Sequence, residues 1–296
     1  MNKFLVNQSE YDSFWQNALA LNGSVTPRVM PNVVLSVLYA VLIACLSHFY
    51  PAISLPVGPL EYGGFIMGLI LVFRVNAGYD RWWEARKLWG NVVNHSRSLA
   101  IIIINYMDNH VDDEGVRLIH KLIALPYVMK NTLRKTVGLS DIEHLLDEAM
   151  LTKLRQHQFP ALYLSSLIAF DLNRAHKKQQ LDSFSFLRAE VQREEILNAQ
   201  GACERILNTP MPFVMAIKSR RFILMFLLML PFALVNFSLL LTPLVTAIVS
   251  YALFSLDQIG LELQNPFSEK NLSHLPLHDI CRTIEENARA LMDAKR

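Results

Sequence analysis

Lysine and arginine are absent from two long stretches of this 296-residue sequence, residues 29–73 and residues 222–269. A charged side chain at the centre of a bilayer costs roughly 2.5–3.5 kcal/mol, and about 20 apolar residues cross the hydrocarbon core. Each stretch is long enough for two crossings. The first is interrupted by three prolines and a glycine in residues 51–59, and the second by Asn236 and Ser238. The sequence therefore predicts four membrane helices in two hairpins.

The sequence also has few cysteines and little net charge. Cys45, Cys203 and Cys281 lie far apart and match neither a disulfide framework nor a zinc knuckle, so we expect buried thiols. The 28 basic and 26 acidic residues nearly cancel, and no basic tract of the kind that binds phosphates is present. Nucleic acid is therefore not expected as a partner.

Motifs of enzymes and metal sites are missing as well. There is no Ser-His-Asp order, no phosphate-binding glycine loop and no HExxH pair. The first three membrane segments contain no acidic or basic residue except Glu61 at a boundary, which argues against an intramembrane enzyme or a proton-coupled transporter. His274 and His278 are separated by Pro276, so they are not expected to share a metal. We expect no enzymatic activity, no cofactor and no metal site.

Hydrophobic residues make up 52% of the chain and charged residues 18%, which indicates one part in lipid and one part in water. Basic residues gather at the outer ends of both predicted hairpins, and the turns have none. By the positive-inside rule, both termini face the cytoplasm in a multi-pass protein of the inner (plasma) membrane. The expected parts are a cytoplasmic N-terminal segment (1–30), a first membrane hairpin (31–75), a cytoplasmic helical domain (76–219), a second membrane hairpin (220–259) and a cytoplasmic C-terminal segment (260–296).

The predicted cytoplasmic domain has apolar residues at helical spacing, as at Val116, Ile119, Leu122 and Ile123. The apolar run 99–104 is too short to cross a bilayer and is expected on the buried face of a long helix. Ser140 and Glu143 form a capping-box pattern, which predicts a helix start. No useful alternation typical of strands is present, so the predicted fold class is all-α.

The second predicted membrane helix, residues 63–73, has an unusual face pattern. Gly64 and Gly68 lie four residues apart, a spacing that lets helix backbones approach closely in lipid. A stripe of bulky residues, about 100° from the glycines, consists of Phe65, Leu69 and Phe73. If copies of this helix surround an axis, the stripe makes stacked apolar rings, which can close a pore by dewetting. From periodicity alone, lipid contact or core packing is favoured over a pore.

The residues that follow this helix change that balance. Residues 73–90 read Phe-Arg-Val-Asn-Ala-Gly-Tyr-Asp-Arg-Trp-Trp-Glu-Ala-Arg-Lys-Leu-Trp-Gly. This stretch resembles the signature of the bestrophin family, whose members share an Arg-Trp-Trp core just past the pore-lining helix. Other segments resemble family motifs in the same order: Cys-Glu-Arg-Ile and Thr-Pro-Met-Pro within 203–212, Leu-Pro-Phe at 230–232 and Asn-Pro-Phe at 265–267. The resemblance covers residues 23–291 and suggests a compact bacterial member.

The resemblance implies a homopentamer in the lipid bilayer that passes small monovalent ions through one central pore. By position, Phe65, Leu69 and Phe73 correspond to the family's hydrophobic neck, and Met211 to a second, cytoplasmic constriction. The family name suggests chloride-like anions. A neck of phenylalanine and leucine carries no charge, so a sodium- or potassium-selective channel of the same fold remains an alternative.

Four signature residues, Arg81, Trp82, Trp83 and Glu84, are interpreted as structural and coupling residues. The arginine and the glutamate are spaced to pair with each other or to reach neighbouring chains, and the tryptophans can anchor an interface. We expect none of the four to lie on the Phe65–Phe73 stripe. Two alternatives of a different class stay open: a non-conducting membrane scaffold, and a transporter that alternates between two states.

The resemblance breaks down at one ligand site. Eukaryotic bestrophins follow the Asn-Pro-Phe-Gly box with a run of aspartates that helps to hold calcium, a cation that requires several oxygen ligands. Here the box continues with Ser268, Glu269 and Lys270, so a serine and a lysine replace acidic positions. The sequence therefore predicts a channel that calcium does not gate.

Overall fold

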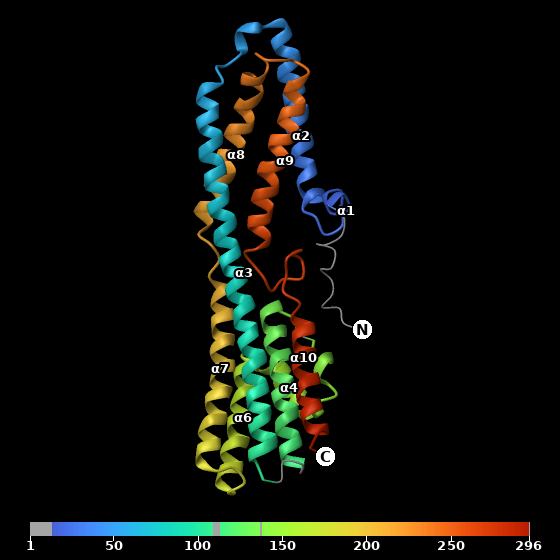
Figure 1. Cartoon of the computed structure of the whole chain (residues 1–296), viewed down its shortest axis with the longest axis vertical. Helices are drawn as coiled ribbons and strands as arrows, with labels where there is room; N and C mark the ends of the chain where they lie inside the picture. Colours follow the sequence, from blue (N-terminus) through green and yellow to red (C-terminus); the bar gives the residue numbers. More distant parts are fainter. Residues whose placement is uncertain (1–13, 109–112, 137, 296) are drawn as a thin grey trace.

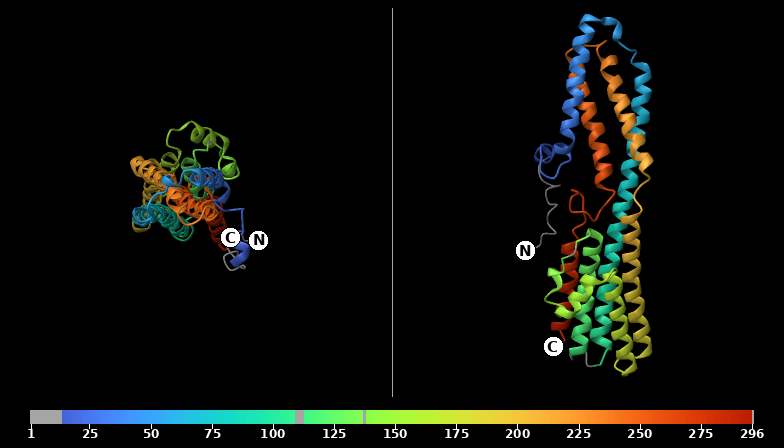
Figure 2. Two further views of the ribbon diagram at one scale, coloured as in Figure 1. Left: turned by 90° about the horizontal axis from the view of Figure 1, so that it is seen from above. Right: turned by 180° about the vertical axis from the view of Figure 1, so that it is seen from behind.

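The computed structural model describes residues 14–108, 113–136 and 138–295, and every regular element in these ranges is a helix. The all-α prediction is confirmed. Figures 1 and 2 show a long bundle. Its helices are α1 (Phe14–Ala18), α2 (Thr26–Phe49), η3 (Pro51–Ile53), α3 (Gly58–Tyr106), α4 (Asp113–Arg134), η4 (Ser140–Ile142), α5 (Glu148–Gln156), α6 (Pro160–Lys177), α7 (Ser183–Asn208), α8 (Phe213–Leu234), α9 (Leu241–Glu262) and α10 (Leu277–Asp293).

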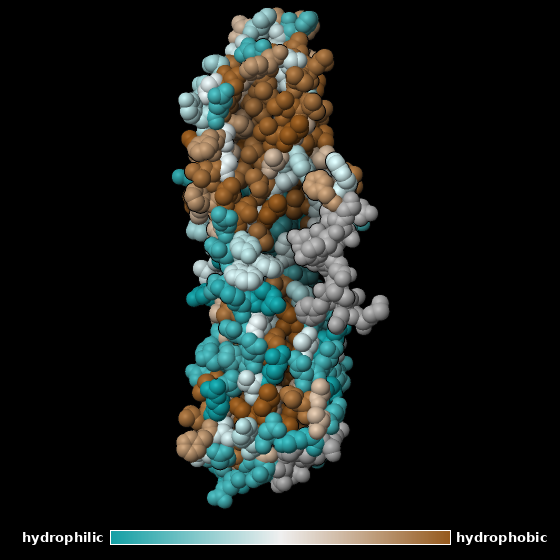
Figure 3. Space-filling view, viewed as in Figure 1, coloured by the Kyte–Doolittle hydropathy of each residue, from teal (hydrophilic) through white to brown (hydrophobic). Residues whose placement is uncertain are grey.

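The bundle has an apolar half and a polar half, one after the other along its axis. The apolar half contains α2, α8, α9 and the first part of α3, and its visible surface in Figure 3 is mostly hydrophobic. The polar half contains α4, α6, α7, α10 and the rest of α3. Among the described residues, α2, α3 and α9 are long and apolar enough to cross a membrane. α8 lies beside them, with Lys218, Arg220 and Arg221 in its first turns.

α3 joins the two halves without a break, which the sequence did not lead us to expect. Its 49 residues extend about 73 Å at 1.5 Å per residue, and no proline follows its first turn. The membrane segment expected to end near residue 73 and the cytoplasmic helix after it are therefore one continuous rod. The expected boundaries at 75/76 and 219/220 fall inside α3 and α8.

The membrane half is organised around α9. Helix α2 packs chiefly against α9 rather than against its sequence neighbour α3, while α3 packs against both α9 and α8. The two turns at the far end are also joined. The backbone N–H of Leu55 donates to the carbonyl of Phe232 at 2.9 Å, and Asn236 Nδ2 donates to the carbonyl of Leu55 at 2.9 Å. The two predicted hairpins are therefore interleaved into one unit.

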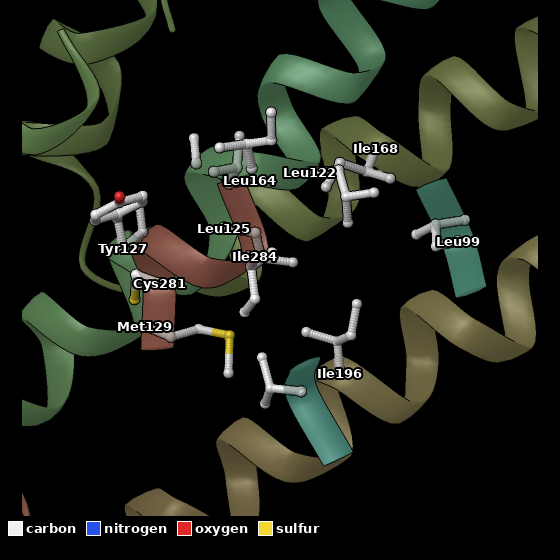
Figure 4. Packing of buried hydrophobic residues seen from close by; sticks show 14 of the residues in the cluster. Leu99, Leu122, Leu125, Tyr127, Met129, Leu164, Ile168, Ile196, Cys281 and Ile284 are labelled. Atoms are coloured by element: carbon white, nitrogen blue, oxygen red, sulfur yellow. The ribbon is translucent and has the colours of Figure 1, made fainter. Parts of the chain in front are cut away.

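The core of the polar half is apolar and contains side chains from α3, α4, α5, α6, α7 and α10, part of which is drawn in Figure 4. Those that converge include Leu99 of α3, Leu122 and Leu125 of α4, Leu164 and Ile168 of α6, Ile196 of α7 and Ile284 of α10. The run 99–104 is buried except for Ile101, as expected. Of the predicted apolar positions of α4, Ile119, Leu122 and Ile123 enter the same core, whereas Val116 is half-buried and lies outside it. This core fixes the lower part of α3 against its neighbours.

One predicted helix start is wrong. Ser140 and Glu143 do not begin an α-helix, because the chain forms a single 3-10 turn there, η4, without a side-chain cap. The next α-helix, α5, is capped instead by Asp147, whose Oδ1 accepts a hydrogen bond from the backbone N–H of Met150 at 2.7 Å. Aspartate caps a helix as well as serine does, so Asp147 is the N-cap here instead of Ser140.

The stability of the polar half should depend on the protonation of His120 in α4. Burial lowers the pKa of its imidazole, the charges of Arg289 and His144 lower it further, and Glu285 opposes them. A histidine with a depressed pKa is held neutral, so its contribution to stability is lost as the pH falls below about 6.5. We expect the melting temperature to drop between about pH 7.5 and about pH 5.5, and to drop less in His120→Gln. Equal drops would contradict this.

Candidate ion pathway

In the membrane half, α3 presents one covered and one uncovered face. Met67 and Leu71 on the covered face are buried in an apolar cluster with α8 and α9. On the uncovered face, Phe65, Leu69 and Phe73 are 75%, 47% and 62% exposed. They form an apolar stripe about 12 Å long. Packing inside the core of a single subunit therefore does not explain the stripe, which is left to lipid or to other copies of the chain.

The two glycines beside this stripe differ in their surroundings. A Cβ on Gly64 would lie 3.4 Å from the ring of Phe226, so Gly64 faces α8. A Cβ on Gly68 would meet no atom of the described residues within 4 Å. Among the glycines of α3, Gly78 is the most closely packed: a Cβ there would be 3.1 Å from Leu263 Cβ and 3.2 Å from the carbonyl oxygen of Gly260 in α9. This close crossing brings charged residues of α3 and α9 together.

Arg74 lies one turn before Gly78 and is only 2% exposed. Its guanidinium forms an ion pair with Asp257 of α9, and Asp257 also accepts a hydrogen bond from Arg220 Nε at 3.1 Å. Within the described residues, Nε and Nη2 of Arg74 have no hydrogen-bond partner. A buried arginine beside the stripe therefore depends on one carboxylate for its compensation.

A second buried carboxylate lies at the end of α9. Glu262 forms an ion pair with Arg28 at the start of α2 and accepts a hydrogen bond from the backbone N–H of Leu272 at 2.7 Å. Arg28 also donates through Nη2 to the carbonyl of Lys270 at 2.8 Å. Glu262 thus connects α2 and α9 with the segment that follows the Asn-Pro-Phe box.

The signature residues lie where the two halves meet. Arg81 donates to the carbonyls of Ile206, at the end of α7, and Gln264, just after α9. Glu84 does not pair with Arg81 in the described chain but forms an ion pair with Arg205 of α7 at 2.7 Å. These contacts tie α3 to the end of α7 and to the segment after α9.

The two tryptophans have different positions on α3. Trp82 Nε1 donates to the carbonyl of Ser273 at 2.7 Å. Trp83 is 45% exposed, and its ring stacks on that of Tyr79 with centres 6.4 Å apart. Trp83 follows Phe65 by about five helical turns in an unbroken helix, so both lie on the same side. None of the four signature residues belongs to the Phe65–Phe73 stripe, but Trp83 lies further along the same side of α3.

Met211 lies in the link of residues 209–212 between α7 and α8, and its side chain is half-buried. Thr209 in the same link accepts a hydrogen bond from Arg81 Nη1 at 2.9 Å. The link is close to the level at which the apolar half meets the polar half (Figure 1). A constriction at Met211 would therefore lie near the membrane boundary, on a different segment from the α3 stripe.

The Asn-Pro-Phe segment is folded, and its side chains contact other parts of the chain. Phe267 is buried, and its backbone N–H donates to Asn265 Oδ1 at 3.1 Å. Glu269 forms an ion pair with Arg134 of α4, so this acidic side chain already has a basic partner. Within the described residues, no group of three or more histidine, cysteine, aspartate or glutamate side chains is placed to hold a metal ion.

Comparison with known proteins gives consistent matches over most of the chain. A family model described as bacterial/fungal bestrophin protein matches residues 5–290. Voltage-dependent anion channel-forming protein alr2987 of Nostoc is 32% identical over 277 residues, which cover 93% of this chain and 90% of that protein. Voltage-dependent anion channel-forming protein YneE of Escherichia coli K12 is 32% identical over 267 residues, which cover 89% of this chain and 86% of that protein.

The fold has a solved counterpart. A crystal structure of a bacterial bestrophin homologue from Klebsiella pneumoniae, carrying a single mutation, superposes with a TM-score of 0.83 at 30% sequence identity. The match covers 90% of this chain and 99% of that one. The agreement therefore extends through both halves of the bundle.

Proposed function

The chain belongs to the bacterial and fungal bestrophin family, and from that premise we propose that it forms a homopentameric channel which passes small monovalent anions of the chloride type. The observation that carries the proposal is a sequence identity of 32%, over about nine-tenths of the chain, to relatives named anion channel-forming proteins. The basic residues at the outer ends of the membrane hairpins favour an inner (plasma) membrane channel with both termini and the polar half in the cytoplasm.

The neck of this channel is the exposed stripe of α3. Five copies of α3 around an axis bring Phe65, Leu69 and Phe73 together as three stacked rings, because the subunit leaves this face uncovered. Narrow apolar rings exclude water and close the path until they widen. Met211 forms the second constriction at the cytoplasmic side of the membrane half. Arg81, Trp82, Trp83 and Glu84 couple α3 to the helices that surround it.

The proposal is tested by recording purified protein in a planar bilayer under a potassium chloride gradient. We expect current with a reversal potential close to the chloride equilibrium value. A value close to that of potassium would replace the anion channel with a cation channel of the same fold. No current would favour a membrane scaffold, and flux limited to the turnover rate of a carrier would favour a transporter.

Calcium removal should leave the current unchanged. Glu269 is paired with Arg134, and a serine and a lysine stand beside it, so the segment lacks the cluster of free oxygen ligands that calcium requires. We expect equal open probability in a calcium chelator and in micromolar free calcium, measured on the same bilayer. Opening that rises with calcium in that range would disprove this expectation.

A further inference from the structure

The uncovered face of α3 continues beyond the neck stripe into the polar half. Because the helix is unbroken, the side that carries Phe65 and Leu69 continues into the polar half. Ala85, Trp89 and Val92 on the opposite side are fully buried in the core. The uncovered side carries the exposed residues Asn76, Asp80, Trp83, Lys87, Asn91 and Asn94. One face of one helix thus changes from apolar to polar where the membrane half ends.

The polar side chains on this face have no partners among the residues that the structure describes. Asp80, Lys87 and Asn94 make no hydrogen bond and no ion pair with any other residue that the structure describes. Of the charged residues just off the face, Arg81 binds backbone carbonyls and Glu84 pairs with Arg205, whereas the side chains of Arg86 and Arg97 have no partner among the described residues. The charged side chains on the face itself are therefore free to contact water and ions.

We propose that this face of α3 is the cytoplasmic wall of the ion pathway and that Asp80 and Lys87 are opposing determinants of ion selectivity. The inference rests on the proposed channel, since the pathway forms only when copies of α3 surround an axis. Asp80 and Lys87 are seven residues apart, about 10 Å along the helix, and both lie on the side of the neck stripe. In an assembly, each becomes a ring of like charge.

Two such rings act in opposite directions on the permeant ions. A ring of carboxylates raises the local concentration of cations, and a ring of ammonium groups raises that of anions. The ring at Asp80 lies closer to the neck, and the ring at Lys87 lies deeper in the polar half. The selectivity of the pathway is then the balance of the two rings, because the neck itself is uncharged.

The test measures reversal potentials of Asp80→Asn and Lys87→Gln under a potassium chloride gradient at low salt. We expect the ratio of anion to cation permeability to rise about twofold or more in Asp80→Asn and to fall by a similar factor in Lys87→Gln. Both shifts should shrink at high salt, where screening weakens the rings. Glu148→Gln and Lys153→Gln provide matched controls on α5, which packs against α6, and should leave the ratio unchanged.

A second measurement does not depend on the charges of Asp80 and Lys87. Asn94→Cys should react with a charged thiosulfonate reagent added from the cytoplasmic side, and the current should change in opposite directions with anionic and cationic reagents. The variant is made in a Cys45→Ser background, and that background alone is the control, because Cys45 is exposed whereas Cys203 and Cys281 are buried. Conducting variants with unshifted reversal potentials and an unreactive Asn94→Cys would overturn this inference alone. Absence of current in the wild type would overturn the proposed channel, and the inference with it.

Discussion

Replacing Asp257 with asparagine should destabilise the folded chain by about 3–5 kcal/mol, the usual cost of leaving a buried charge unpaired. Asp257 is the one ion-pair partner of the fully buried Arg74 within the described residues. The guanidinium cannot lose its proton, so it stays charged after the substitution. Thermal or denaturant unfolding of purified protein, followed by the loss of helical circular dichroism, measures the effect.

The pair also predicts an asymmetry. Arg74→Met should cost less than Asp257→Asn, because Asp257 keeps its hydrogen bond from Arg220 at 3.1 Å, and Arg220 is exposed to solvent. The double variant Arg74→Met/Asp257→Leu should recover much of the loss, since replacing both members of a buried pair by apolar residues is often neutral. If Asp257→Asn is as mild as the surface substitution Glu148→Gln, the pair contributes little to stability.

The features that could be predicted from the sequence are those set by neighbouring residues. The stretches without lysine or arginine, 29–73 and 222–269, mark the membrane half because one charge in lipid outweighs several apolar contacts. The apolar face of α4 and the stripe of Phe65, Leu69 and Phe73 follow from the helical period. Each of these depends on residues within a few turns, so no knowledge of the tertiary fold is required.

What could not be predicted depends on residues far apart in the sequence. The crossing at Gly78 and Gly260 joins two helices between which five other α-helices, α4 to α8, lie in the sequence. The pairs Arg74–Asp257 and Arg28–Glu262 follow from the same packing of α9 against α3 and α2. A signal was present, because Asp257 and Glu262 are carboxylates at the end of a long apolar run and would need basic partners. Their partners could be found only once the helices were placed.

The boundary expected after residue 75 is an error of another kind, because the sequence predicted a break where α3 is continuous. Composition changes sharply after Phe73, and a change in composition suggests a boundary between parts. A helix, however, ends where its backbone hydrogen bonds end, and no proline interrupts α3 after its first turn. Lipid on one section and water on the next are both compatible with one helix, because its backbone groups are satisfied internally throughout. The same face can therefore serve both environments.

Shortening Leu69 to alanine should raise the single-channel conductance several-fold. Leu69 is the middle residue of the neck stripe, with Phe65 and Phe73 one turn away on either side. In a pentamer the substitution removes five isobutyl groups from one ring, which widens the narrowest apolar segment and lowers the cost of wetting it. Planar-bilayer recordings in symmetrical potassium chloride measure the change, and Met211→Ala tests the second constriction in the same way.

The control for this prediction is Leu38→Ala on α2, which makes the same chemical change on a side chain that is also exposed in the single chain. If the stripe of α3 faces lipid, Leu69→Ala and Leu38→Ala should both leave the conductance unchanged. If it lines the neck, only Leu69→Ala should raise the conductance, while the melting temperatures of both variants stay close to that of the wild type, because neither side chain is part of the buried core. Comparing the pair therefore separates a pore-lining surface from a lipid-facing one of the same composition.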